Sequence, residues 1–190
     1  VPGSSGTPVP GYALQLRDGD TGERLDEPEA VGDLWVKGGS ALAYYWHNQA
    51  KTRRAFQGPW FFTGDRYRRA ADGSYTYEGR ADDMIKVKGL WVSPIAIENR
   101  LIEHEHVSEA AVIAVESDGF QRVRAYVILR PGAADDGTLT AVLQAWCKDA
   151  LLRYQYPHEV VYVLDFPRTT TGKVQRFRLR ELAATLREGG

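Results

Sequence analysis

The spacing of apolar residues divides the chain into two parts with different expected structures. Before residue 80, short apolar runs alternate with turn residues such as Asp18-Gly19-Asp20 and Asp72-Gly73. This pattern is typical of a small antiparallel β unit. The first eleven residues, VPGSSGTPVPG, have turn composition and no periodicity, so we expect only turns there. The pattern predicts strands over residues 13–16, 33–37, 60–63 and 74–77, and one short helix over residues 48–56.

After Arg80 the pattern changes to strands interleaved with helices. Ser93 is a favourable helix N-cap with Pro94 at the first helical position, and Ile97 and Leu101 follow at i, i+4 spacing. The fold class is therefore α+β: a small C-terminal domain of short sheets flanked by helices, preceded by an antiparallel β segment, with the boundary at residues 80–83. The expected later elements are strands over residues 110–115, 123–129 and 160–164 and helices over residues 139–151 and 178–186.

Composition narrows the classes of protein further. The 190 residues carry a formal net charge of −1 and are 43% hydrophobic and 11% aromatic, so a real core is expected and neither nucleic acid nor a membrane is an expected partner. Cys147 is the single cysteine, which excludes a disulfide framework within the chain and fits a cytoplasmic, reducing location. No apolar run approaches the length of a membrane span.

The pentad Phe61-Phe62-Thr63-Gly64-Asp65 sets an acid directly after a glycine at the end of a predicted strand. One interpretation is a turn aspartate. The other is a carboxylate that accepts hydrogen bonds from two neighbouring hydroxyls, as on a ribose. Arg80, one short hairpin later, either holds the same nucleotide or forms a surface ion pair.

A polar loop from Pro167 to Lys173, PRTTTGK, connects a predicted strand to a predicted helix. It is not a phosphate-binding P-loop, because Val174 stands where serine or threonine would bind magnesium. The loop is either a flexible connection with a solvated lysine or a mobile arm that delivers a compact cation to a place where negative charge builds. Spacing alone leaves both open.

Two further groups of residues give weaker signals. His104-Glu105-His106 has two histidines at i, i+2 spacing and no third ligand in view, so we expect a solvated turn and predict no metal site. Cys147 lies among apolar residues at helical spacing and is expected to be inert core.

Charged residues crowd the segment GRADDMIKVKGLWVSP, residues 79–94, although its apolar residues indicate extended backbone. A strand that only had to fold would not need this cluster. In this order along the chain, GDLWVKG (32–38), FFTGD (61–65), the opening GRADDMIKVKG and TTTGK (169–173) resemble the C-terminal part of the adenylate-forming superfamily of acyl- and aryl-CoA ligases. The combination of WFFTGDRYRR, TYEGRADDM and GLWVSP is most similar to the benzoate-CoA ligase branch.

This resemblance implies a two-step reaction on an aromatic carboxylate. The carboxylate attacks the α-phosphorus of MgATP to give an acyl adenylate, and the thiol of coenzyme A then displaces AMP. Asp65 would bind the ribose hydroxyls, Arg80 the ribose and phosphate region, and Lys173 would be the adenylation lysine. Mg²⁺ would be held mainly by polypeptide that precedes Val1 in this family.

The resemblance also gives the charged segment a role. Asp82 falls at the family's hinge, about which the C-terminal domain rotates between the two steps. Rotation would withdraw Lys173 and present the face that carries Lys86, a second catalytic lysine, and Gly89, which would lie against the pantetheine arm. Residues 1–81 would be the end of the large adenylating domain, and residues 82–190 the mobile C-terminal domain.

The chain departs from the family pattern in places that matter for the acceptor. Tyr154 would stack on the adenine of coenzyme A, but Gln155 and Tyr156 stand where basic residues are expected for its phosphates. Ala96 replaces a glutamate that would complete a capping box with Ser93.

Alternatives therefore stay open. One is an adenylation domain that loads a carrier protein, and another is a stand-alone binding or regulatory module without catalysis. In every case we expect the chain to need the missing N-terminal domain for adenylation. Lysines at the position of Lys173 are targets of acetylation in this family, so an acetyltransferase and a deacetylase are further expected partners.

Overall fold

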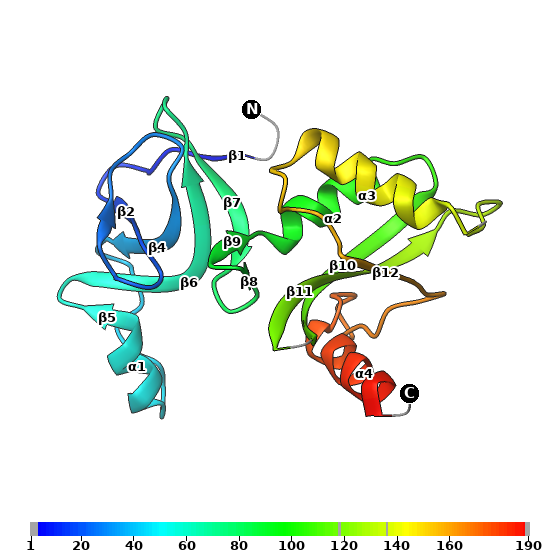
Figure 1. The fold of residues 1–190 in the computed structure, drawn as a ribbon. Coiled ribbons are helices and arrows are strands. Elements are labelled where there is room, and N and C mark those ends of the chain that lie inside the picture. The colour runs from blue at the N-terminus through cyan, green and yellow to red at the C-terminus, as the bar shows by residue number, and fades with distance from the viewer. Residues whose placement is uncertain (1–3, 118, 136, 189–190) are drawn as a thin grey trace. The chain divides into compact units, whose positions relative to one another are not determined.

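The computed structural model describes residues 4–117, 119–135 and 137–188. The chain forms two compact units, of which the first ends at Asp82 and the second begins at Asp83. Figure 1 traces the elements of both units in chain order. Each unit has its own sheet and its own buried apolar cluster, so each unit has a hydrophobic core of its own.

The first unit is an antiparallel sheet with one short helix. The strand order is β1-β7-β6-β4-β2-β3, and β5 pairs with β6. The two predicted turns form: Asp18 Oδ1 accepts hydrogen bonds from the N–H groups of Asp20 and Thr21, and Asp72 Oδ1 accepts one from Ser74. The elements are β1 (Ser4–Gly6), β2 (Ala13–Arg17), β3 (Arg24–Leu25), β4 (Val31–Lys37), α1 (Gln49–Ala55), β5 (Phe56–Gln57), β6 (Trp60–Arg69) and β7 (Tyr75–Arg80).

Alternation along the strands places the core of the first unit on one face of this sheet. Leu14 and Leu16 lie on the same side of β2, because side chains point to opposite faces in turn. Their partners on β4 are Val36 and Leu34, and all four belong to one apolar cluster with Tyr75. The period-2 pattern of the sequence therefore sets which face of the sheet is buried.

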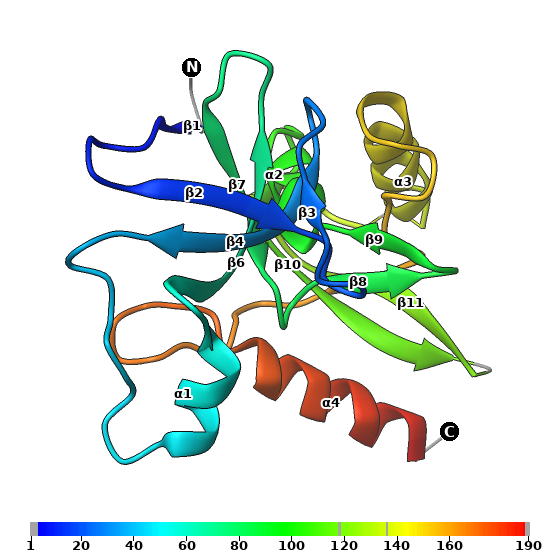
Figure 2. The same cartoon turned by 90° about the vertical axis from the view of Figure 1, so that its left-hand side faces the viewer.

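The second unit combines a hairpin, three helices and a three-stranded sheet. In that sheet β10 pairs antiparallel with β11, and β11 pairs parallel with β12. Figure 2 shows the β8–β9 hairpin beside β11. The elements are β8 (Ile85–Val87), β9 (Leu90–Val92), α2 (Pro94–Ile102), β10 (Val107–Ser117), β11 (Phe120–Leu129), α3 (Leu139–Ala150), β12 (Glu159–Tyr162) and α4 (Arg176–Glu188).

The three-stranded sheet of the second unit has a separate core on each face. Val112 and Ala125, which are register partners, belong to the cluster that α2, α3 and the β8–β9 hairpin cover. Ala111 and Tyr126, one position away on each strand, belong to the cluster that contains Leu179 of α4. In Figure 1, α3 and α4 accordingly lie on opposite sides of β10, β11 and β12. The α+β class is confirmed.

Local signals for the helices are borne out by hydrogen bonds. Ser93 Oγ accepts a hydrogen bond from the N–H group of Ala96 at 3.2 Å, with Pro94 in the first turn of α2. Cys147 of α3 is fully buried, and burial raises the pKa of its thiol to about 11, so the thiol is an inert part of the core. In the part of the chain that the structure describes, no helix is long and apolar enough to cross a bilayer.

Two expectations from the sequence are wrong, and a third is refined. Ser4–Gly6 is not a turn but strand β1, which pairs with β7 although it carries no apolar side chain. The segment after Asp83, where the sequence indicated extended backbone, is the β8–β9 hairpin, whose two-residue turn is Lys88-Gly89. His104 is not solvated: it is only 9% exposed, and its ring meets the Trp146 ring edge-on at a centroid distance of 5.4 Å.

Candidate active site

Asp65 and Arg80 are partners across two strands of the first unit. They face each other in the β6–β7 register, and an Nη1 hydrogen of Arg80 is donated to Asp65 Oδ1 at 2.9 Å. The same nitrogen lies 3.3 Å from the carbonyl oxygen of Thr63, and the Asp65 N–H group donates to Thr63 Oγ1 at 3.1 Å. Asp65 is thus part of a strand, not an isolated turn residue, and half-buried. The structure brings these two predicted residues together; the ligand that they take stays a prediction.

Gly64 makes this pairing possible. Its backbone has a φ of +80°, and a Cβ atom built there would lie 2.7 Å from Nη2 of Arg80. Any side chain at this position would therefore displace the guanidinium that holds Asp65, in addition to straining the backbone. The FTGD segment is thus shaped for close passage of Arg80 over the glycine.

A cavity of about 490 Å³ opens beside this pair. Asp82, the predicted hinge residue, lies at its edge, with Oδ1 at 3.5 Å from Nε of Arg80. The cavity is rich in cationic side chains, which suits an anionic or polyhydroxylated ligand. It is lined by Tyr45, Lys51, Arg54, Ala55, Phe62, Thr63, Gly64, Arg80, Ala81 and Asp82.

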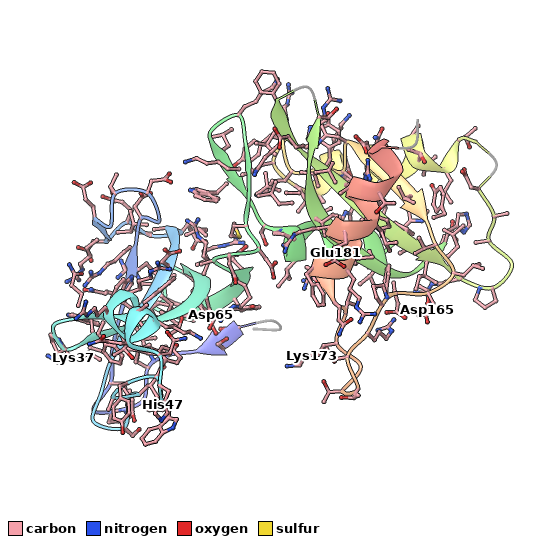
Figure 3. All side chains as sticks on the ribbon, turned by 90° about the horizontal axis from the view of Figure 1, so that it is seen from below. Lys37, His47, Asp65, Asp165, Lys173 and Glu181 are labelled. Carbon is pink, nitrogen blue, oxygen red and sulfur yellow. The ribbon has the colours of Figure 1, made fainter. Side chains whose placement is uncertain are left out.

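Lys173 lies on an exposed loop of the second unit, and its side chain projects away from the ribbon (Figure 3). Among the described residues its ammonium has no acidic partner. The loop is closed, not extended: Thr169 N–H donates to Lys173 O at 2.9 Å, and Lys173 N–H donates to Thr169 Oγ1 at 3.1 Å. An isolated bridge joins Arg168 and Val174. The loop is therefore a small hairpin, in which Lys173 follows directly after the turn.

Lys86 and Gly89 lie on the β8–β9 hairpin. Lys86 Nζ sits 4.9 Å from the centre of the Trp91 ring, and Lys86 N–H donates to Gln121 Oε1 at 3.1 Å, so the hairpin is anchored to the start of β11. Gly89 has a φ of +84°, and a Cβ atom there would meet nothing within 4 Å. A narrow moiety could pass over Gly89 without a side chain in its way.

Aromatic and basic side chains gather near the segment that contains Tyr154. Tyr154 packs at the edge of the α2–α3 core. Lys148 Nζ lies 4.0 Å from the centre of the Tyr156 ring, which lies 4.9 Å from that of His158. Burial lowers the pKa of His158, and the charges of Arg122, Lys88 and Lys148 lower it further.

These three basic residues form a group around His158 that sequence reasoning missed. Lys88 is on the hairpin turn, Arg122 on β11 and Lys148 on α3. The expectation of missing basic residues rested on positions 155 and 156 alone. Three separate elements supply the cations. The sequence alone does not show that these residues lie near one another, because their proximity depends on how β8, β11 and α3 pack.

The Lys173 loop and the β8–β9 hairpin belong to opposite faces of one sheet. Val174 and Phe166, at the ends of the loop, pack in the α4-side core. Ile85 and Val87 of the hairpin pack in the α2–α3 core. The second unit therefore carries two separate chemical surfaces, each with an exposed or half-exposed lysine.

Metal ligands are not gathered in the described parts of the chain. In residues 4–117, 119–135 and 137–188, no three His, Cys, Asp or Glu side chains converge as a metal site.

Comparison with known proteins connects both units to one group of enzymes. Residues 96–173 match the family described as AMP-binding enzyme C-terminal domain. A 4-hydroxybenzoate–CoA/benzoate–CoA ligase of Rhodopseudomonas palustris is 46% identical over 182 residues, which is 95% of this chain and 33% of that protein. The chain thus spans about a third of the length of the curated relatives it matches.

Solved structures give the same result. The benzoate CoA ligase from Burkholderia xenovorans LB400 is 43% identical, with a TM-score of 0.81 over 94% of this chain and 35% of that one. The anthranilate CoA ligase AuaEII, solved in complex with anthranoyl-AMP, is 40% identical, with a TM-score of 0.87 over 99% of this chain and 35% of that one.

Proposed function

We propose, from the premise that residues 96–173 belong to the AMP-binding enzyme C-terminal domain family, that the complete protein is an ATP-dependent ligase. It joins an aromatic carboxylic acid of the benzoate type to coenzyme A. Relatives named as benzoate-CoA ligases match nearly the whole chain in sequence and in structure, which supports this substrate class. Cys147 as the single cysteine fits an enzyme of the cytoplasm.

The first step forms the acyl adenylate. A carboxylate oxygen of the acid attacks the α-phosphorus of ATP, and the bond to pyrophosphate breaks. Asp65 accepts hydrogen bonds from the ribose hydroxyls, and Arg80 holds the carboxylate of Asp65 and the ribose side of the nucleotide. Lys173 bridges the acid and the α-phosphate as negative charge grows there. Magnesium bound to ATP would offset phosphate charge in this step.

The second step forms the thioester. The sulfur of coenzyme A attacks the acyl carbon, AMP leaves, and the thiol proton passes to solvent. We assign the β8–β9 hairpin to this step, with Lys86 at the reaction centre and Gly89 against the pantetheine arm. Tyr154 contacts the nucleotide end of coenzyme A. Asp82 is the hinge about which the second unit turns between the steps.

One observation carries this assignment most directly. The Lys173 loop and the β8–β9 hairpin belong to opposite faces of the same sheet, so a single orientation of the second unit would not bring both to one reaction centre. A reaction with two steps and a rotation between them accounts for both surfaces. A stand-alone binding module has no need for two.

Removing the ammonium of Lys173 is the direct test of the adenylation role. Lys173→Ala in the complete protein is expected to lower ATP–pyrophosphate exchange about 10²–10³-fold, because one preorganised contact to developing charge is lost. Thioester formation from supplied acyl adenylate should continue. Exchange at the wild-type rate would contradict the proposal, as would exchange catalysed by this chain alone. Because Lys173 is exposed, acetylation can reach it and would have the same effect by removing its charge.

The basic group around His158 favours coenzyme A over a carrier protein as the acceptor. Lys88, Arg122 and Lys148 are exposed and provide the cations that positions 155 and 156 lack. A nucleotide with phosphate groups suits such a group beside the Tyr156 ring. A carrier protein brings pantetheine without the nucleotide, so these cations would have no nucleotide phosphates to bind.

The acceptor is tested with a thiol that lacks the nucleotide. Lys148→Gln and Arg122→Gln should each raise the KM for coenzyme A about tenfold, since a hydrogen bond to a charged group contributes about 1.5 kcal/mol. The KM for pantetheine should stay unchanged, and Lys37→Gln in the first unit serves as the control. If the KM for coenzyme A is unchanged in these variants, or if the KM values for both thiols rise equally, loading of a carrier protein becomes the better interpretation.

A further inference from the structure

The Lys173 loop is held at both ends by arginine–glutamate pairs. At its start, Nη2 of Arg168 lies 2.8 and 2.7 Å from the two carboxylate oxygens of Glu109 on β10. At its end, Nη2 of Arg176, the first residue of α4, lies 2.9 and 2.8 Å from those of Glu98 on α2. Each pair joins the loop to an element distant in sequence, so together they fix where the loop sits on the sheet.

The two pairs differ in what they contribute. Glu98 has a side chain only 10% exposed and also accepts the Val112 N–H at 2.7 Å. Its loss would leave buried polar groups without partners and would damage the fold. Glu109 is 45% exposed and Arg168 is 31% exposed, and ion pairs this accessible to solvent add little to stability. The Glu109 pair is therefore separable from folding.

Orientation is what the Glu109 pair supplies. Arg168 also donates from Nη1 to the carbonyl oxygen of Gly172 at 3.2 Å and closes the bridge with Val174. Lys173 lies between these two residues. The guanidinium fixed by Glu109 on the strand therefore holds the carbonyl group directly before Lys173, while the backbone bridge holds the residue after it. Asp165, whose carboxylate lies 3.7 Å from Nε of Arg168, is the competing acid toward which Arg168 would turn if Glu109 were lost.

We propose that Glu109 is a positioning residue for adenylate formation, acting through Arg168 on the loop that carries Lys173. This rests on the proposed role of Lys173. A displacement of a reacting group by about 1 Å costs up to about 10²-fold in rate, so the effect belongs in the rate of adenylate formation and not in substrate affinity. The β8–β9 hairpin packs in the other core, so thioester formation does not depend on Glu109.

The test compares variants of the complete ligase in its two half-reactions. Glu109→Gln removes the charge and keeps the size of the side chain. We expect ATP–pyrophosphate exchange to fall about 10-fold to 100-fold in kcat, with the KM values for ATP and acid, thioester formation from supplied acyl adenylate and the melting temperature essentially unchanged. Glu109→Asp, which keeps the charge that Arg168 contacts, should retain most of the exchange rate.

Glu103→Gln is the matched control. It removes the 2.8 Å ion pair with Arg100 on α2, where Glu103 is 61% exposed, and should change neither half-reaction. Normal exchange by Glu109→Gln, equal loss in both half-reactions, or the same loss of exchange in Glu109→Asp would overturn the positioning role. Failure of the proposed function itself is a separate outcome. In that case Lys173→Ala would show normal ATP–pyrophosphate exchange.

Discussion

At the scale of single residues, two backbone positions show how local conformation serves the candidate site. Gly64 has a φ of +80°, a conformation that favours glycine, and Nη2 of Arg80 lies only 2.7 Å from the place that a Cβ atom would occupy. Gly89 is required by its φ of +84° in a hairpin turn, although space around it is open. Both glycines are favoured by a positive φ, and Gly64 is favoured in addition by the close passage of Arg80. A substitution of Gly89 therefore strains the hairpin, whatever it does to the acceptor.

Lys88 is the other residue of this turn, and its φ of +49° is unfavourable for lysine. Positive φ at both turn residues is the geometry of a type I′ turn, for which Asn-Gly is a preferred pair. Lys88→Asn should therefore raise the free energy of unfolding by about 0.5–1 kcal/mol, measured by urea titration. Lys88→Gln is the control, because it removes the charge without easing the conformation, and a gain of the same size there would contradict this explanation.

At the scale of elements, the sequence predicted what depends on nearby residues. The N-cap at Ser93 was identified because an N-cap bonds to an N–H group three residues later. Strand β1 was missed because its residues Ser4–Gly6 have no apolar pattern and are ordered by β7. The basic group around His158 was missed for a related reason: its members come from three elements, and only packing brings them together.

The turn after α2 also depends on packing between distant elements, and this packing makes the stability of the protein depend on pH. Burial, followed by the charge of His106, lowers the pKa of His104, which contacts Trp146. The unfolded chain therefore binds more protons than the folded one below pH 6.5, the ordinary histidine pKa, so the free energy of unfolding should fall as the pH drops through and below that value. His158, whose pKa is also lowered, adds to this loss.

His104→Asn tests the contribution of that histidine. The asparagine oxygen can accept the His106 N–H that His104 Nδ1 accepts at 3.3 Å, but it does not titrate. We expect a smaller loss of stability between about pH 7 and pH 5, followed by urea titration at each pH, with the remaining slope due to His158. His47→Asn in the first unit is the control. An unaltered slope in His104→Asn would show that His104 is not responsible.

At the scale of the whole molecule, the feature that matters is the division between Asp82 and Asp83. The charged cluster that surrounds it was visible in the sequence, and its expected role came from the family resemblance, because charge near a boundary does not by itself reveal which surfaces it faces. Asp82 has a side chain 79% exposed, with one ion pair at 3.5 Å to Arg80. Such a weak contact costs little to break, as a hinge requires.

Asp82→Pro tests the hinge in the complete protein. Proline fixes φ and restricts the residue before it, so the two half-reactions should be affected unequally, with one slowed at least about tenfold relative to the other. Asp82→Asn is the control: it removes the charge that Arg80 contacts and leaves the backbone free, so both half-reactions should persist. Unchanged rates for both half-reactions in the proline variant would remove Asp82 from the hinge role.

The two cores on either side of β10 and β11 have a consequence for how such a protein can diverge. Val112 and Ile113 are neighbours in the chain but support different cores. A mutation at one of them is felt first on a single face, because adjacent strand residues point in opposite directions. Sequence changes in one core can therefore accumulate without directly disturbing the other, because alternate residues of β10 and β11 support different cores.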